Sequence, residues 1–295
     1  MEKSAMITIC GRPNVGKSTL TNALVGEKIA IVSDKPQTTR SRITAIVEHG
    51  ETQLVLMDTP GFHKPRTRLG DYMVNVVSQS VADVDLVLLL VEPVAEIGRQ
   101  EEGLIARLRE TGAPAVLVIN KIDTVERPRL LEVMALYSAA YDFDALIPIS
   151  AKTGEGIPEL LDEMEKYAVE GPHLFPDDMI TDQPERQICA ELVREKLLKC
   201  LDKEIPHGTA VEVTRFSERS SGIIDLEVTI YCEKDSHKGI IIGKKGAMLK
   251  RIGELARKDI EDFMGTKVNL QTWVKVKENW RDSASLLRNF GFKNE

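Results

Sequence analysis

Four short strings follow one another in a fixed order along the 295 residues, and they constrain the fold more than any other feature. They read GRPNVGKST at residues 11–19, DTPG at 58–61, NKID at 120–123 and SAK at 150–152. The first has the form GxxxxGK[ST], a glycine-rich loop that holds phosphate when it joins a strand to a helix. Each later string also follows an apolar run, with room for a strand and a helix between strings. The order therefore predicts an α/β domain whose strands end at one ligand site.

Apolar runs and amphipathic stretches alternate through the first 170 residues, which indicates a mostly parallel sheet with helices on both faces. Strands are expected at Ala5–Cys10, Ile43–Glu48, Gln53–Met57, Leu86–Val91, Ala115–Ile119 and Ala145–Ile149. Helices are expected at Lys17–Val25, Gly70–Val81, Glu101–Thr111, Pro128–Tyr141 and Pro158–Val169. A short His-Gly-Glu turn joins the second and third strands, so this pair is expected to form an antiparallel hairpin.

A second domain is expected after residues 171–185, a linker rich in proline and acidic residues. Beyond the linker we expect helix Arg186–Leu201, strands Thr209–Ser217 and Ile223–Tyr231, helix Ala247–Phe263, strand Lys267–Val276 and a final helical piece at Trp280–Phe290. Trp273 and Trp280 flank the last strand and are expected to anchor packing. The predicted division is therefore 1–170, the linker 171–185, a smaller α+β domain at 186–279, and a tail at 280–295.

Charge differs between the two halves of the chain. Residues 1–180 hold 18 basic and 27 acidic side chains, a balance of −9, whereas residues 181–295 hold 21 basic and 19 acidic, a balance of +2. The overall charge of −7 argues against non-specific coating of nucleic acid but allows a local basic patch. No basic-plus-apolar leader opens the chain and the apolar run Leu86–Val91 is far too short to span a bilayer, so we expect a cytoplasmic protein. The four cysteines lack metal-type spacing and are expected to be reduced thiols.

The first two strings predict a site for polyphosphate and Mg²⁺. Lys17 is expected to reach the β- and γ-phosphates, and Ser18 to offer its hydroxyl to the ion. Asp58 is expected to hold Mg²⁺ through water, and the Gly61 N–H to meet the γ-phosphate. Thr39, chosen over its neighbour in the polar segment 34–42, is expected to complete the ion's shell when the γ-phosphate is present. The loop residues expected around the phosphates are Gly11, Arg12, Pro13, Asn14, Val15, Gly16, Lys17, Ser18 and Thr19, and the catalytic set is Lys17, Thr39 and Gly61.

The last two strings predict how the base is recognised. Asp123 offers two acceptor oxygens, which match the N1–H and N2–H₂ donors of guanine, a pair that adenine lacks. Lys121 can lie along the base plane, and the Ala151 N–H can donate to guanine O6 while Lys152 covers the ring. Asn120 and Ser150 complete the two strings. The chain is therefore expected to bind GTP and GDP.

A basic stretch in the second domain reads GIIIGKKG at residues 239–246. It resembles the GxxG loop of a type II KH RNA-binding module, in which two glycines let the backbone approach a sugar–phosphate chain. Lys244, Lys245 and the start of the following helix favour phosphate. The alternative is an ordinary glycine-bounded turn with solvated lysines. The residues expected to contact RNA are Ile240, Ile241, Ile242, Gly243, Lys244, Lys245, Gly246 and Lys250.

Three strings, PQTTR, DTPGFHKP and FPDDMITDQPER, resemble the Era family of bacterial ribosome-assembly GTPases over essentially the whole chain. The resemblance implies an α/β P-loop GTPase domain followed by a KH-type domain. It also implies hydrolysis of GTP with Mg²⁺, binding of the 3′ end of 16S rRNA, and a monomer acting in assembly of the 30S subunit. Phe62 stands where Ras-like enzymes place a water-orienting glutamine, so intrinsic hydrolysis is expected to be slow. Asn14 resembles the asparagine that holds K⁺ in some relatives.

Two other interpretations stay open at this point. The chain could be an RNA-binding chaperone whose nucleotide site is mainly structural. It could also be a signalling GTPase attached peripherally to the inner face of the cell membrane, although no lipidation string or long basic amphipathic helix supports this.

Overall fold

A computed structural model describes residues 1–61, 67–80 and 84–292, with the side chains of 77–80 left aside. The chain divides into two compact units. The first comprises Met1–Ala30, Thr39–Lys64 and Met73–Asp182, and the second comprises Ile31–Thr38, Pro65–Tyr72 and Gln183–Glu295. The second unit therefore includes two short segments from the N-terminal half of the sequence. Each unit is described by itself.

The first unit is built on a seven-stranded sheet with the order β2-β3-β1-β4-β5-β6, to which β7 adds by pairing with β1. The strands are β1 (Lys3–Cys10), β2 (Ile43–His49), β3 (Thr52–Asp58), β4 (Leu86–Val91), β5 (Ala115–Ile119), β6 (Ala145–Pro148) and β7 (Val169–Glu170). All neighbours are parallel except the β2–β3 hairpin and the β1–β7 pair. The mostly parallel sheet and its antiparallel edge hairpin are thus as the sequence predicts.

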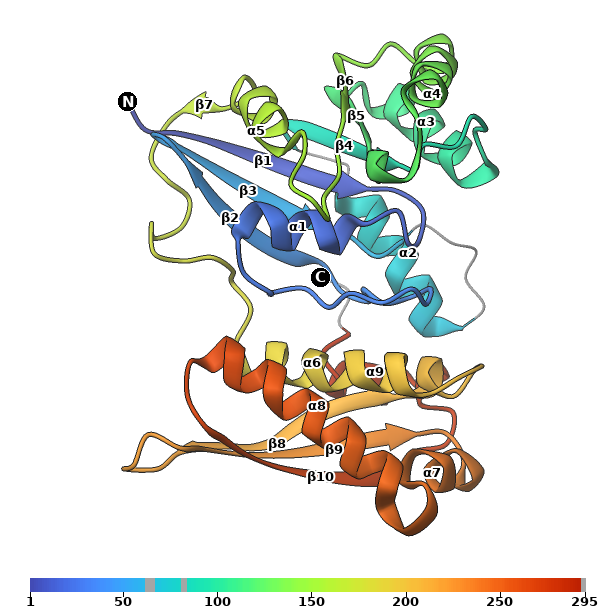
Figure 1. The fold of residues 1–295 in the computed structure, drawn as a ribbon, viewed down its shortest axis with the longest axis vertical. Coiled ribbons are helices and arrows are strands. Elements are labelled where there is room, and N and C mark those ends of the chain that lie inside the picture. The colour runs from blue at the N-terminus through green and yellow to red at the C-terminus, as the bar shows by residue number, and fades with distance from the viewer. Residues whose placement is uncertain (62–66, 81–83, 293–295) are drawn as a thin grey trace. The chain divides into compact units, whose positions relative to one another are not determined.

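Helices cover both faces of this sheet (Figure 1). They are α1 (Lys17–Val25), α2 (Arg68–Ser80), α3 (Arg99–Thr111), α4 (Arg127–Ala140) and α5 (Ile157–Glu165). Side chains of β4 alternate between two apolar clusters: Leu86, Leu88 and Leu90 pack with α1 and α5, while the intervening residues pack with α3 and α4. β4 is fully buried, as expected for a central parallel strand.

The second unit carries a three-stranded sheet in the order β10-β9-β8. Its elements are α6 (Glu185–Cys200), β8 (Ala210–Glu218), β9 (Ile224–Cys232), α7 (Asp235–Ile242), α8 (Ala247–Met264), β10 (Val268–Val276) and α9 (Ala284–Asn289). β9 runs antiparallel to β8 and parallel to β10. Apolar residues of α6 and α8 pack against one face of this sheet to form a single core. The result is the smaller α+β domain that the sequence predicts.

Three details differ from the sequence-based expectations. The expected helix over Pro158–Val169 ends at Glu165, and Val169 instead begins β7. The basic stretch before the GxxG loop contains a helix, α7, that was not expected. The final piece divides into a 3₁₀ turn at Trp280–Asp282 and the short α9.

The two tryptophans have different environments. Trp280 is completely buried and its indole N–H donates to Gly208 O at 2.9 Å, which confirms its packing role. Trp273 is 55 % exposed on β10, so the expectation that it anchors packing was wrong. The four cysteines are free thiols, three of them buried. Within the described residues, every helix is too short or too polar to cross a membrane.

Candidate functional site

The four strings lie at the carboxyl ends of β1, β3, β5 and β6, the edge at which parallel sheets bind ligands. Gly16 ends the phosphate loop with a φ of 101°, in the left-handed region that favours glycine. A β-carbon on Gly16 would lie 2.2 Å from Nδ2 of Asn120. The glycine is therefore required both by the backbone and by close approach of the base-reading string.

Lys17 places its ammonium group inside the phosphate loop. Only 6 % of the residue is exposed, and Nζ donates to the carbonyl oxygens of Gly11 at 3.2 Å and Arg12 at 3.0 Å. Burial lowers the pKa of Lys17, while the negative charge of Asp58 opposes that shift. Two weak backbone acceptors hold a buried cation here, so a phosphate anion would be a far better partner.

Ser18, Thr39 and Asp58 converge on one point. Ser18 Oγ lies 2.9 Å from Thr39 Oγ1 and donates to Asp58 Oδ2 at 2.7 Å. Asp58 is fully buried, and its Oδ1 finds no hydrogen-bond partner among the described residues. Burial raises the pKa of Asp58 to about 6, against the charge of Lys17 and the Ser18 hydrogen bond. The two hydroxyl groups and the carboxylate bring oxygen ligands together, and one buried carboxylate oxygen has no hydrogen-bond partner among the described residues. This arrangement fits a hard cation such as Mg²⁺.

The geometry also separates the two candidate threonines. The Thr38 hydroxyl donates to its own loop, to Lys35 O at 2.6 Å, whereas Thr39 faces Ser18. This placement favours Thr39 as the switch threonine. A β-carbon on Gly61 would lie 2.8 Å from Pro13 Cγ, so the DTPG string packs against the phosphate loop. Phe62 lies outside the described residues.

Asn120 connects the phosphate loop to the SAK string. Its side-chain amide donates to Val15 O at 2.8 Å, and its Oδ1 accepts from the Ala151 N–H at 2.9 Å. Only 2 % of the residue is exposed. The Ala151 N–H, predicted to donate to guanine O6, is therefore already engaged by Asn120. Sequence spacing could not show this connection, because the three strings are far apart in the chain.

The carboxylate of Asp123, which the sequence predicts to read the base, is held by the fourth string. Ser150 Oγ donates to Asp123 Oδ1 at 2.7 Å, and Ser150 itself is completely buried. Lys152, two positions after Ser150 in the sequence, is exposed. Lys121 adopts a φ of 64° and donates through Nζ to Asn14 O at 2.7 Å, while the Asn14 residue is exposed. Hydrogen bonds thus connect Asn120 and Ala151, and Asp123 and Ser150, and they join Asn120 and Lys121 to the phosphate loop.

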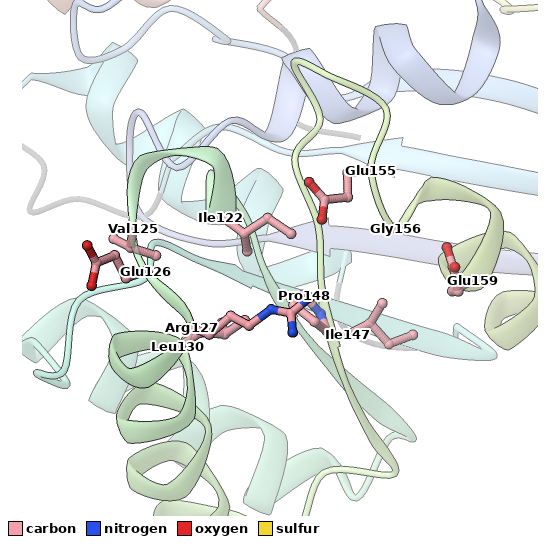
Figure 2. Close-up of a pocket in the computed structure, with 10 residues that line it drawn as sticks. All are labelled: Ile122, Val125, Glu126, Arg127, Leu130, Ile147, Pro148, Glu155, Gly156 and Glu159. Carbon is pink, nitrogen blue, oxygen red and sulfur yellow. The ribbon is translucent and has the colours of Figure 1, made fainter.

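A cavity of about 410 Å³ is lined by Ile122 of the NKID string and by residues that follow NKID or flank the SAK string (Figure 2). Its lining residues are Ile122, Val125, Glu126, Arg127, Leu130, Ile147, Pro148, Glu155, Gly156 and Glu159. The residues predicted to read guanine are absent from this lining. The cavity is therefore distinct from the predicted nucleotide site.

The GxxG loop joins α7 to α8. Gly243 has φ 72° and ψ 175°, and a β-carbon there would lie 2.7 Å from Met248 Cβ, so only glycine fits. Lys244, Lys245 and Lys250 are exposed, as is Ile240, which is half uncovered. Ile241 is completely buried in the core and Ile242 is partly buried. The loop thus offers its lysines and Ile240 to a ligand, while Ile241 packs inward.

Comparison with known proteins agrees with this geometry. Residues 6–121 match the family described as 50S ribosome-binding GTPase, and residues 204–281 match the KH domain family. The chain is 52 % identical over 291 residues to the GTPase Era of Ruminiclostridium cellulolyticum, covering 99 % of this chain and 98 % of the relative. The chain belongs to the Era family of GTPases. The GTPase Era of Clostridium kluyveri is 51 % identical over 293 residues, covering 99 % of this chain and 100 % of the relative.

Two solved structures of Era proteins extend over the whole chain. A point variant of Aquifex aeolicus Era bound to GDP·AlF₄⁻ has a TM-score of 0.95 at 35 % identity, covering 99 % of this chain and 100 % of that one. Era in complex with MgGDPNP and nucleotides 1506–1542 of 16S ribosomal RNA has a TM-score of 0.93 at 35 % identity, with full coverage of both chains. The predicted family, fold class and GTP-hydrolysing activity of this Era-family chain are thereby confirmed.

Proposed function

We propose that this GTPase is a switch that binds single-stranded 16S rRNA near its 3′ end and acts in maturation of the 30S subunit. The carrying observation is that one chain holds both the residues predicted to bind guanine nucleotide, at one edge of its sheet, and an exposed GxxG loop. A relative similar over its full length was solved with MgGDPNP and nucleotides 1506–1542 of 16S rRNA. The GxxG loop of a KH module clamps about four nucleotides of an unpaired strand, which supports a single-stranded partner.

Mg²⁺ is the cofactor that this proposal requires. Ser18, Thr39 and Asp58 would hold it, and its charge would neutralise the phosphate oxygens on which hydrolysis acts. The unsatisfied buried oxygen of Asp58 supports this assignment. Titration of Mg²⁺ against the GTP-bound protein tests it, and equal nucleotide retention with and without the ion would contradict it.

The segment Ile31–Thr38 supports a connection between the switch and the RNA-binding unit, to which it belongs by its contacts. Arg194 of α6 donates to Thr38 O, and Glu195 Oε1 accepts from the Val32 N–H at 3.0 Å. Thr38 is covalently joined to Thr39. A movement of Thr39 toward a bound cation would therefore pull on residues that α6 holds.

Potassium is a second proposed ion, held by Asn14 close to the β–γ bridge. The asparagine is exposed to solvent on the phosphate loop. Such an ion would stabilise developing charge in place of an arginine finger. Equal turnover of the purified protein in Na⁺ and K⁺ buffers would contradict this role.

An RNA chaperone with a structural nucleotide site is the alternative from another functional class. Asp123→Asn distinguishes the two, because an amide offers guanine one acceptor and one donor in place of two acceptors. Under the switch proposal the variant loses GTP-dependent RNA binding and regains it with xanthosine triphosphate. If RNA affinity is the same with and without nucleotide in both the wild type and the Asp123→Asn variant, the chaperone is favoured.

Location and assembly state follow from the proposed partner. A ribosome-directed switch acts in the cytoplasm as a monomer, and a peripheral contact with the inner membrane face is the competing arrangement. Vesicle flotation of the purified protein without RNA tests that contact. Recovery with anionic vesicles would support it, and sedimentation analysis would report the monomer.

A further inference from the structure

The central strand β4 contributes no residue to the four strings, although it lies between two strands that do. β4 is flanked in the sheet by β1, which leads into the phosphate loop, and by β5, which leads into the NKID string. The first residue beyond β4 is Glu92. Because carboxyl ends of parallel strands meet at one edge, this side chain starts between the phosphate loop and the base-reading string.

The carboxylate of Glu92 accepts hydrogen bonds from both neighbours. Lys121 Nζ donates to its Oε1 and an Arg12 guanidinium nitrogen donates to its Oε2. Lys121 Nζ also donates to Asn14 O at 2.7 Å. Arg12 Nε in turn lies 3.3 Å from Oε1 of Glu101, whose side chain is 5 % exposed. One carboxylate therefore joins a cation of the base-reading string to a cation of the phosphate loop.

We propose that Glu92 is a positioning residue that holds Lys121 in place to lie along the guanine plane. Lys121 has four rotatable side-chain bonds and is 37 % exposed, so on its own it would lose considerable rotamer entropy on contacting the base. Fixing Nζ between Glu92 and Asn14 O removes that cost before the nucleotide arrives. Burial raises the pKa of Glu92, but the hydrogen bonds and charges of Lys121 and Arg12 lower it by more. The net pKa lies below the ordinary value, so the carboxylate is ionised at neutral pH.

The inference rests on the proposed guanine-nucleotide switch and on the contact with the base that the sequence predicts for Lys121, and it predicts how nucleotide kinetics change. Glu92→Gln keeps the size of the side chain and removes its charge. We expect the dissociation rate of GDP to rise about tenfold, the size of one charge-assisted hydrogen bond in a partly exposed site. The KM for GTP should rise by a similar factor while kcat stays within twofold, because Lys121 contacts the base and not the reacting phosphoryl group.

A double-mutant cycle in GDP dissociation separates this role from a general structural one. Glu92→Gln in the Lys121→Ala background should add little to the effect of Lys121→Ala alone, because Glu92 acts through Lys121. Glu96→Gln, an exposed acid in the loop after β4, is the matched control and should dissociate GDP at the wild-type rate. Glu92→Asp, which keeps the charge on a shorter stem, should lie between wild type and Glu92→Gln and serves if the latter fails to fold.

Three results would overturn the inference. They are an unchanged GDP dissociation rate in Glu92→Gln, effects of the two single changes that multiply, and a fall in kcat equal to the fall in kcat/KM. The last result would mean that Glu92 acts through Arg12 on the phosphate loop. Failure of the wild-type protein to bind GDP would instead reject the proposed nucleotide site itself, so the two failures are distinguishable.

Discussion

Two glycines at the ends of α1 provide a matched test of how the nucleotide site is built. Gly16 and Gly26 both have positive φ, 101° and 79°, so an alanine at either position is strained. They differ in their surroundings. A β-carbon on Gly16 would meet Asn120 Nδ2 at 2.2 Å, whereas a β-carbon on Gly26 has nothing within 4 Å. Gly26→Ala should therefore report backbone strain alone, about 1–2 kcal/mol of stability.

Gly16→Ala should add the displacement of Asn120 to that strain. Moving the amide leaves Val15 O and the Ala151 N–H without the partners they have at 2.8 and 2.9 Å. A buried polar group that loses its partner costs about 1–3 kcal/mol, so the pair amounts to about 2–6 kcal/mol. Even the lower limit corresponds to a loss of about 30-fold in nucleotide affinity if the loop must be restored for binding.

Calorimetric titration with GDP and thermal melting of both variants measure these effects. We expect Gly26→Ala to melt at a lower temperature and to bind GDP within about twofold of wild type. Gly16→Ala should melt at a lower temperature than Gly26→Ala and lose at least about 30-fold in affinity. A folded Gly16→Ala protein that binds GDP within threefold of wild type would refute the idea that Asn120 connects the loop to the SAK string.

The remaining predictions concern single side chains. Lys17→Ala removes the buried ammonium group and should abolish GTP binding by calorimetry; unchanged binding would contradict the site. Lys244→Glu should weaken binding of an RNA oligonucleotide at least tenfold, because it replaces a positive charge with a negative one that repels phosphate. GTP hydrolysis should stay near normal, since the change avoids the backbone clash that a side chain at Gly243 would cause. A hydrogen bond to Asp177, then one to Glu51 O, raises the pKa of His173. Asp177→Asn should therefore destabilise more at pH 6 than at pH 8, since the contribution is lost as pH rises through the folded-state pKa; equal denaturation shifts would contradict this.

Sequence patterns predicted those parts of the structure that local chemistry decides. Alternating apolar runs located the strands of both sheets except the short β7, and the four strings located the edge at which the site lies. The choice of Thr39 over Thr38 also agrees with the geometry, because the Thr38 hydroxyl turns back to Lys35 O. These features depend on periodicity, on turn chemistry and on the carboxyl ends of parallel strands.

The features that the sequence did not predict depend on tertiary contacts, which leave no local pattern in the sequence. Trp273 and Trp280 both flank the last predicted strand, so their sequence positions do not distinguish them. Trp273 is exposed, whereas Trp280 is buried and donates a hydrogen bond to the Gly208 carbonyl. Helix α7 was missed for two reasons. A glycine within it disfavours helix, and its three consecutive isoleucines do not show the spacing of apolar residues that marks an amphipathic helix. Glu92 was missed because β4 carries no recognised string, although a polar residue directly after a buried central strand is a usable signal.

Buried charges on α6 were missed for the same reason. Arg194 and Glu195 are almost fully buried, and Lys196 pairs with both Glu195 and Asp259 of α8. Charged residues are normally assigned to a solvated helix face, so periodicity alone excludes them from a core. Arg194 and Glu195 also bond to Thr38 and Val32, which lie more than 150 positions away in the sequence.

Competition among nucleotides tests the central claim most directly. The protein is loaded with fluorescent GDP, and displacement by GDP, GTP, ADP and ATP is followed at equal concentrations. If Asp123 selects guanine by accepting hydrogen bonds from its N1–H and N2–H₂ donors, GDP and GTP displace the probe and the adenine nucleotides fail to do so at a hundredfold higher concentration. Displacement by ATP as effective as that by GTP would contradict guanine selection, and with it the control of RNA binding that we propose.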